Sequence, residues 1–192
     1  MDESNYLQEG QIYCSAQHGE ETAPSILTGD VVITRCPALH PGDVRVVTAV
    51  DVPPKSPLRA LHNCVVFSSQ GDRDLPSQLS GGDLDGDLYN IIYDGGLYPA
   101  KEVDPADYPI AKPIDIGREV TRSDMTDFFI RFMENDALGR ISTLHQTLAD
   151  QKEKGTLDPD CIVLAGMASI AVDFSKTGIP VSCVNPCKGR SY

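Results

Sequence analysis

Three aspartates stand at alternate positions in one short stretch: Asp83, Asp85 and Asp87 within SGGDLDGDLYN, residues 80–90. No basic residue lies within nine positions of Asp85. Two like charges about 4 Å apart repel each other by roughly 4 kcal/mol at an effective dielectric constant near 20. The side chains therefore either spread into water or surround a positive charge that the neighbouring sequence does not supply.

The spacing of the three aspartates limits how they act together. In a helix Asp85 would point away from the other two, and in a regular strand the three would stand about 6–7 Å apart. A loop kinked at Gly86 instead turns all three inward, and Gly81 and Gly82 allow unusual backbone angles or a close approach to substrate. Carboxylate oxygens gathered in this way suit Mg²⁺, or alternatively Mn²⁺.

The main alternative to a metal site is a solvated acidic turn, because Asp and Gly are ordinary turn residues. Strict alternation followed by the apolar stretch LYNII favours the metal interpretation. A calcium EF-hand loop starting at Asp83 would need Gly and Glu where this chain has Leu88 and Asp94. A haloacid-dehalogenase phosphatase would have a buried strand before the motif, and LPSQLSGG is not one.

The charge of the chain is acidic and uneven. The formal net charge is −12, and residues 1–100 hold 5 Lys and Arg against 14 Asp and Glu, whereas residues 101–192 hold 11 against 14. A self-sufficient nucleic-acid binder would show a basic surface instead. Any work on RNA or DNA must therefore use metal ions or basic residues from elsewhere in a larger protein.

Composition and cysteine spacing indicate an intracellular globular protein. Hydrophobic residues make up 41% of the 192 residues, which is enough for a real core. The six cysteines form no C-x-x-C pair and several lie in apolar runs, so we expect reduced thiols and no zinc site. No secretory leader is evident, and CIVLAGMASIAV is too short to span a bilayer. We expect a nuclear or cytoplasmic protein without a membrane partner.

The first half of the chain reads as short strands separated by Gly and Pro turns, which suggests a compact barrel rather than a parallel α/β sheet. The expected strands are 30–35, 44–50, 63–68 and 88–94. We assign 1–98 to this β-rich part, 99–122 to a Pro-rich connector, 123–182 to a helical segment and 183–192 to a tail.

Helical signals mark the second half. Thr121 and Asp124 predict a capping box, and the apolar residues that follow at helical spacing predict core packing: Met125, Phe128, Phe129, Phe132 and Met133. We expect Gly139 to end this helix before a second one, and a third to begin at Asp158 as N-cap with Pro159 in its first turn.

Two stretches of the chain resemble the catalytic region of eukaryotic RNA-silencing RNA-dependent RNA polymerases, most similarly those of fungi. They are TGDVVITRCPALHPGDVRVVTAVDVP and LHNCVVFSSQGDRDLPSQLSGGDLDGDLYNIIYD. The later LGRISTLHQTLADQKEKGTLDPDCIVLAGMASIAVDFSKTG resembles the helical segment that follows in the same family. The D-x-D-G-D core also occurs in multisubunit DNA-dependent RNA polymerases, and the flanking residues separate the two groups.

The resemblance implies an α+β fold, in which the second of two facing double-psi β-barrels is followed by helices. Asp83, Asp85 and Asp87 match the family's metal-binding aspartates. They would serve template-directed nucleotidyl transfer from nucleoside triphosphates by a two-metal mechanism that makes double-stranded RNA. Lys176 matches a basic position in the family's helical segment that approaches the active site, where it would bind substrate, although a solvated lysine remains nearly as good an interpretation.

Other residues and functions stay open. HPGD at 40–43 is most simply a turn, and we give His40 no catalytic role. Arg35 and Arg45 either contact RNA or pair with acids such as Asp43. The alternative functions are a non-catalytic acidic module that binds metal or protein, and a part of a DNA-dependent RNA polymerase.

We predict that the 192-residue chain alone folds at least partly but does not polymerise RNA. Family members are far longer, and the basic residues of the first barrel would be needed to offset the acidic charge around the aspartates. Incubation of the purified chain with template RNA, nucleoside triphosphates and Mg²⁺ or Mn²⁺ checks this. Template-dependent synthesis that is lost in Asp85→Ala would show that the chain is a complete polymerase.

Overall fold

The computed structural model describes residues 1–17, 23–108 and 111–181. The chain divides into two compact units, Met1–Asp107 and Tyr108–Tyr192, and the division lies inside the expected connector. Within the described residues, no helix has the length and apolar character needed to cross a membrane. The expected tail at 183–192 lies outside them.

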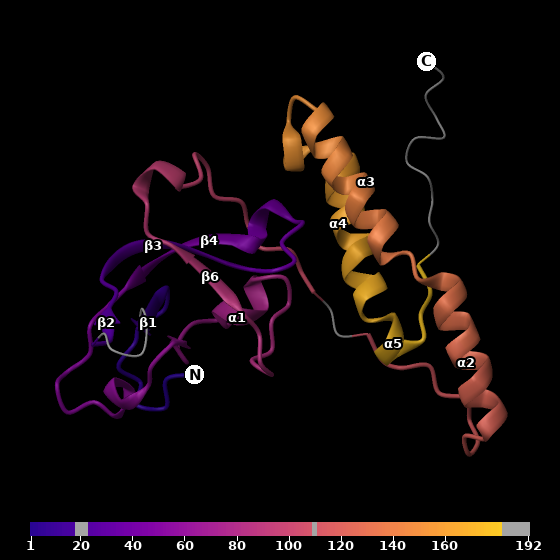
Figure 1. The fold of residues 1–192 in the computed structure, drawn as a ribbon, viewed down its shortest axis with the longest axis horizontal. Helices are drawn as coiled ribbons and strands as arrows, with labels where there is room; N and C mark the ends of the chain where they lie inside the picture. The colour runs from indigo at the N-terminus through magenta and orange to yellow at the C-terminus, as the bar shows by residue number, and fades with distance from the viewer. Residues whose placement is uncertain (18–22, 109–110, 182–192) are drawn as a thin grey trace. The chain divides into compact units, whose positions relative to one another are not determined.

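The first unit is built on a six-stranded sheet (Figure 1). Strands 30–35, 44–50, 63–68 and 88–94 are confirmed within a residue or two. The sheet order is β2-β1-β4-β3-β6, with β5 also paired to β1; among the described residues the β1–β4 pairing is parallel and the others are antiparallel. The strands are β1 (Gln11–Ala16), β2 (Ser25–Ile26), β3 (Gly29–Arg35), β4 (Val44–Ala49), β5 (Cys64–Phe67) and β6 (Tyr89–Ile92).

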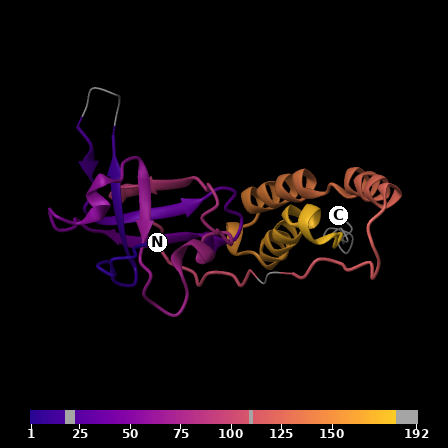
Figure 2. The same ribbon diagram turned by 90° about the horizontal axis from the view of Figure 1, so that it is seen from below.

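The sheet curls so that a side chain of β5 contacts a side chain of β6. Strands β5 and β6 lie at opposite ends of the pairing order, yet the rings of Phe67 and Tyr89 contact edge to face with centroids 4.9 Å apart. Phe67 belongs to a buried cluster that takes side chains from β1, β3 and β4, and Tyr89 packs against it. This curled sheet, visible in Figures 1 and 2, agrees in outline with the expected barrel.

Strand alternation divides the apolar side chains of this unit between two cores. On β1, Ile12 faces the cluster inside the curled sheet and Tyr13 faces a second cluster on the other side. On β5, Phe67 and Val66 divide in the same way. Because neighbouring residues of a strand point to opposite faces, a strand buried on both faces loses the polar–apolar alternation of a surface strand.

Strand β1 was not expected from the sequence, although it pairs with β2, β4 and β5. Its sequence, QIYCSA, is short and ends in small residues, so its local strand preference is weak. The strands on both of its edges form hydrogen bonds with its backbone N–H and C=O groups. This stabilisation comes from distant parts of the chain, so the local sequence pattern does not predict it.

The aspartate loop lies between helix α1 (Leu75–Gln78) and strand β6, against the sheet. The Asp74 side chain caps α1, and the Gly82 N–H donates a hydrogen bond to the Pro76 carbonyl at 3.0 Å. A Cβ at Gly82 would lie 2.8 Å from the Tyr89 hydroxyl and 3.1 Å from Cδ of Arg35. Only glycine therefore fits at position 82 without moving its neighbours.

The segment HPGD is a structural turn, as expected. It forms a 3₁₀ turn, Pro41–Asp43, in which His40 Nδ1 accepts from the Gly42 N–H and the Asp43 carboxylate accepts from the His40 N–H. Asp43 is fully buried and also accepts from the Ser80 N–H at 3.2 Å, while Ser80 Oγ donates to the Pro37 carbonyl. This turn thus anchors the residue at which the aspartate loop begins.

The second unit is helical. Helices α3 (Leu138–Gln151) and α4 (Pro159–Val172) lie side by side (Figures 1 and 2), and α2 (Arg122–Asn135) and the short α5 (Phe174–Thr177) complete it. The N-cap at Asp158 with Pro159 next is confirmed. The buried apolar side chains come from three of the helices: Ile141, Leu148, Cys161, Leu164, Ala165, Ala168 and Phe174.

Two expectations for α2 are wrong. Its apolar stripe is only partly packed rather than core, with Met125, Phe129 and Met133 all more than half exposed. Phe128 and Phe132 stack on Phe174, with centroids 6.0 and 6.1 Å away, and no side chain of α2 is buried in the described structure. The helix also ends at Asn135 rather than at Gly139, which lies in the first turn of α3. The spacing of apolar residues predicts that a helix forms, but it does not predict which part of the protein covers the apolar face of that helix.

We predict that Gly82→Ala loosens the packing beneath the aspartate loop. Overpacking of this kind typically costs about 1–3 kcal/mol, so amide hydrogens of β3 and β6 should exchange roughly 5- to 150-fold faster. Gly95→Ala is the matched control, because a Cβ there meets nothing within 4 Å. Equal exchange in the two variants would show that position 82 has room for a side chain.

We predict that Thr121→Ala frays α2, because the capping box is confirmed: Thr121 Oγ1 accepts from the Asp124 N–H, and Asp124 accepts from the Thr121 N–H. Loss of such a cap typically costs about 1 kcal/mol, or about fivefold faster amide exchange in the first turns. Thr126→Ala removes a hydroxyl that bonds only the Arg122 carbonyl within the same helix, and should leave exchange unchanged or slower. Fraying in both variants alike would contradict the capping role.

Candidate metal centre

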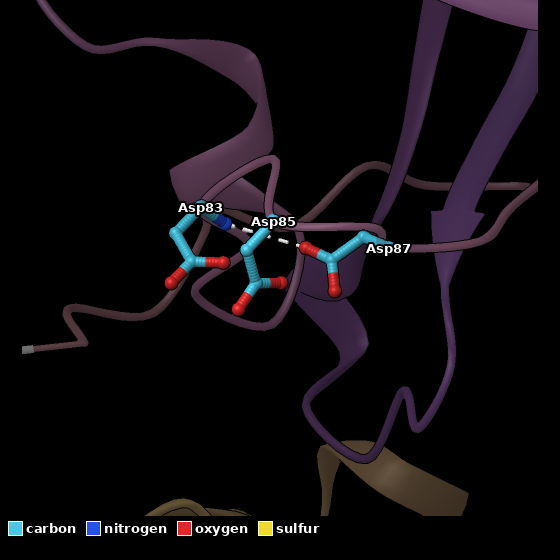
Figure 3. A group of neighbouring side chains, drawn as sticks. All are labelled: Asp83, Asp85 and Asp87. Carbon is cyan, nitrogen blue, oxygen red and sulfur yellow. Dashed lines mark hydrogen bonds between the residues drawn. The ribbon is translucent and has the colours of Figure 1, made fainter.

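The three aspartate side chains converge on one point. Figure 3 shows the carboxylates of Asp83, Asp85 and Asp87 turned to the same side of the loop. One oxygen from each lies within 4.8 Å of the others. Asp83 and Asp85 are exposed, whereas the side chain of Asp87 is only 9% exposed. The loop thus presents at least two carboxylates to solvent while the third is held against the protein.

Left-handed backbone angles produce this convergence. Gly81, Leu84 and Gly86 have φ of +66°, +66° and +119°. The kink expected at Gly86 is confirmed, whereas the left-handed Leu84 was not expected, because residues other than glycine rarely adopt this conformation. The Asp83 N–H closes the loop by donating to Oδ2 of Asp87 at 3.3 Å.

A counter-charge reaches the loop from a distant strand. Arg35, the last residue of β3, places Nη2 2.7 Å from Oδ1 of Asp87. Its Nη1 donates to the Ser80 carbonyl at 3.1 Å. The absence of basic residues near the loop in sequence is therefore compensated by the fold. Of the two uses left open for Arg35, the structure shows pairing with an acid, and the acid is Asp87.

The ion pair keeps Asp87 ionised. Burial alone would raise the pKa of Asp87, but the hydrogen bond and charge of Arg35, together with the N–H groups of Asp83 and Leu84, hold it below its usual value. Burial likewise opposes the charge on Arg35, and the Asp87 carboxylate outweighs it and raises the pKa of the guanidinium. The pair therefore stabilises the loop at neutral pH and is lost as pH falls through the lowered pKa of Asp87.

Tyr89 lies beside this pair and remains a neutral phenol. It stands opposite Arg35 in the β3–β6 register. Burial, and then the charge of Asp87, raise the pKa of Tyr89 to about 12. Its hydroxyl is buried and has no hydrogen-bond partner among the described residues. Tyr89 is thus suited to packing rather than to proton transfer.

The donor set fits a divalent cation. Three carboxylates with one arginine leave two formal negative charges at the loop. Magnesium commonly takes one or two protein carboxylates and completes its shell with water and substrate phosphates. Exposed carboxylates that converge without filling a closed cage leave room for such partners.

The other basic residues considered from the sequence have acceptors within their own units. Lys176 lies on α5 in the second unit, 72% exposed, with Nζ 3.8 Å from the Asp173 carboxylate. Arg45 donates to the Val103 carbonyl at 3.0 Å and lies 4.0 Å from Glu102. Arg45 is thus also engaged by protein acceptors.

Comparison with known proteins places the chain in a family. The family profile described as RNA dependent RNA polymerase matches residues 1–191. A probable RNA-dependent RNA polymerase 1 of Oryza sativa subsp. japonica is 41% identical over 94% of this chain, which spans 24% of the rice protein. RNA-dependent RNA polymerase 1 of Schizosaccharomyces pombe is 38% identical over 80% of this chain and 13% of its own length. Plant and fungal relatives are thus similar to a comparable degree.

A solved structure supports the fold. The RNA dependent RNA polymerase QDE-1 from Thielavia terrestris superposes over 95% of this chain with a TM-score of 0.73, at 24% identity. The chain spans about a fifth of that protein and a quarter or less of the two curated relatives above. Since the family profile covers nearly every residue of the sequence, the chain belongs to the RNA-dependent RNA polymerase family.

Proposed function

We propose that this chain carries the metal-binding catalytic loop of an RNA-dependent RNA polymerase. The observation that carries the proposal is the convergence of Asp83, Asp85 and Asp87, each with an oxygen within 4.8 Å of the others, in a chain of this family. The reaction is template-directed transfer of a nucleotide from a nucleoside triphosphate to an RNA 3′-hydroxyl.

In this reaction the 3′-oxygen forms a bond to the α-phosphorus of the incoming nucleotide, and the bond to pyrophosphate breaks. When bound, divalent ions would favour deprotonation of the hydroxyl and offset the charge of the triphosphate and pyrophosphate. Asp83 and Asp85 offer exposed oxygens, and Asp87 offers a carboxylate whose position and ionisation Arg35 maintains. Mg²⁺ is the expected ion, with Mn²⁺ as its alternative.

We further propose that the curled sheet belongs to a double-psi β-barrel, the second of two that face each other across the active site. The parallel β1–β4 pairing and the contact between β5 and β6 support a closed arrangement. The first barrel would supply basic residues for nucleoside triphosphates and template RNA. Lys176, exposed on the second unit, is a further candidate for substrate binding. The biological setting we propose is intracellular RNA silencing through double-stranded RNA synthesis.

We predict that Mn²⁺ or Mg²⁺ stabilises the protein through the three aspartates. An ion at 100 times its dissociation constant adds about 2.7 kcal/mol to the free energy of unfolding, which for a protein of this size raises the thermal midpoint by roughly 5–10 °C. A triple variant with Asn at positions 83, 85 and 87 should lose this shift. The charge-matched control changes three exposed acids of the same unit to amides: Glu3, Asp72 and Asp107. If the triple Asn variant keeps the metal-induced shift, whether or not the control variant loses it, the three aspartates are not the metal site.

We predict that Asp85→Asn abolishes Mg²⁺-dependent nucleotide incorporation by the full-length protein while leaving its fold intact. The side chain is exposed, so its replacement opens no cavity and removes a repulsive charge. Incorporation is measured on RNA and on DNA templates, with circular dichroism as the control for folding. Undiminished activity in the folded variant would assign the loop a non-catalytic role, and preference for a DNA template would contradict the RNA-dependent reaction.

A further inference from the structure

Arg35 contacts the aspartate loop at both of its ends. Its Nη1 donates to the carbonyl of Ser80 at 3.1 Å, and its Nη2 lies 2.7 Å from the carboxylate of Asp87. One guanidinium thus joins the residue that precedes the loop to the last of the three aspartates. Two donors in a fixed planar fork set the relative position of two acceptors, which a single-point ammonium cannot do.

The sheet, rather than the loop, fixes where Arg35 lies. Arg35 ends β3 and pairs in register with Tyr89, the first residue of β6. Its Cδ lies against Gly82, where a Cβ would come within 3.1 Å of it. The side chain is 22% exposed and its Asp87 partner 9% exposed. Because the sheet holds Arg35 in place, the contacts of Arg35 fix the position of the exposed loop relative to the sheet.

We propose that Arg35 is a positioning residue that holds Asp83, Asp85 and Asp87 in the convergent arrangement that binds metal. This inference rests on the proposed function of the loop. Arg35 acts through Asp87 and Ser80 and need not touch the metal, and its effect is to fix the distance between the two ends of the loop.

The charge of Arg35 and its geometry have opposite effects on metal binding. Removal of a positive charge beside three carboxylates should strengthen the attraction of a cation, if electrostatics alone decides. Removal of a positioning contact lets the carboxylates separate under their mutual repulsion, and affinity should fall. The sign of the change in affinity therefore distinguishes the two roles.

Titration of the full-length protein with Mn²⁺, followed by the electron paramagnetic resonance signal of the free ion, measures this affinity. The triple Asn variant at positions 83, 85 and 87 defines binding elsewhere in the protein. We expect Arg35→Gln to weaken the site at least tenfold. Arg45→Gln is the matched control: it removes the same charge from the adjacent strand β4, where Arg45 bonds Val103 rather than the loop. It should stay within about twofold of wild type.

Arg35→Lys separates position from charge even if Arg35→Gln fails to fold. Lysine keeps the positive charge but cannot bridge two acceptors with a planar fork, so we expect weaker Mn²⁺ binding and a raised Mg²⁺ requirement for activity. Excess Mg²⁺ should restore much of the maximal rate, which would not follow from a merely misfolded protein. Wild-type affinity in Arg35→Lys, or tighter binding in Arg35→Gln, would overturn the positioning role.

These outcomes are distinguishable from failure of the proposed function. If wild type and the triple Asn variant bind Mn²⁺ equally, the metal site itself is wrong and the role of Arg35 falls with it. If wild type binds at the loop and the Arg35 variants bind equally well, only the positioning role is wrong.

Discussion

The mutual repulsion of three carboxylates confined to five residues is the constraint on which this structure depends. Left alone, the side chains of Asp83, Asp85 and Asp87 would separate into water. The ion pair between Arg35 and Asp87 opposes this by neutralising one charge and fixing its position, at an N–O distance of 2.7 Å. Two formal negative charges remain, which matches a divalent cation. The same negative charges that repel one another in an empty loop therefore attract a divalent cation.

The curled sheet makes this arrangement possible. It brings the end of β3 beside the start of β6 and places the ring of Phe67 against that of Tyr89. Gly82 then allows the loop backbone to approach Arg35 and Tyr89 more closely than any side chain would permit. An exposed loop is thus tied to rigid elements at both ends, which is the arrangement that precise ligand geometry requires. The shape of the loop is a consequence of packing beneath it.

Local pattern predicts the parts of this protein that depend on neighbours in sequence. Alternating aspartates with Gly86 predicted a kinked acidic loop, and the capping pair of Thr121 and Asp124 predicted where α2 begins. Arg35 could not be assigned in the same way, because it pairs with an aspartate 52 positions later that only the β3–β6 register brings near. The spacing of the apolar residues in α2 correctly predicted a helix. It did not predict how exposed these side chains are, because their exposure depends on what packs against the helix. Strand β1 was missed because its partners, not its residues, make it a strand.

The convergence of the three aspartates on a metal ion is tested by anomalous diffraction from crystals of the full-length protein grown with Mn²⁺, because this experiment locates the ion and the side chains together. We expect an anomalous peak about 2.0–2.3 Å from an oxygen of Asp83, of Asp85 and of Asp87, with Arg35 still bonded to Asp87. A peak at another site, or a loop whose three carboxylates stay apart with Mn²⁺ in excess, would contradict it.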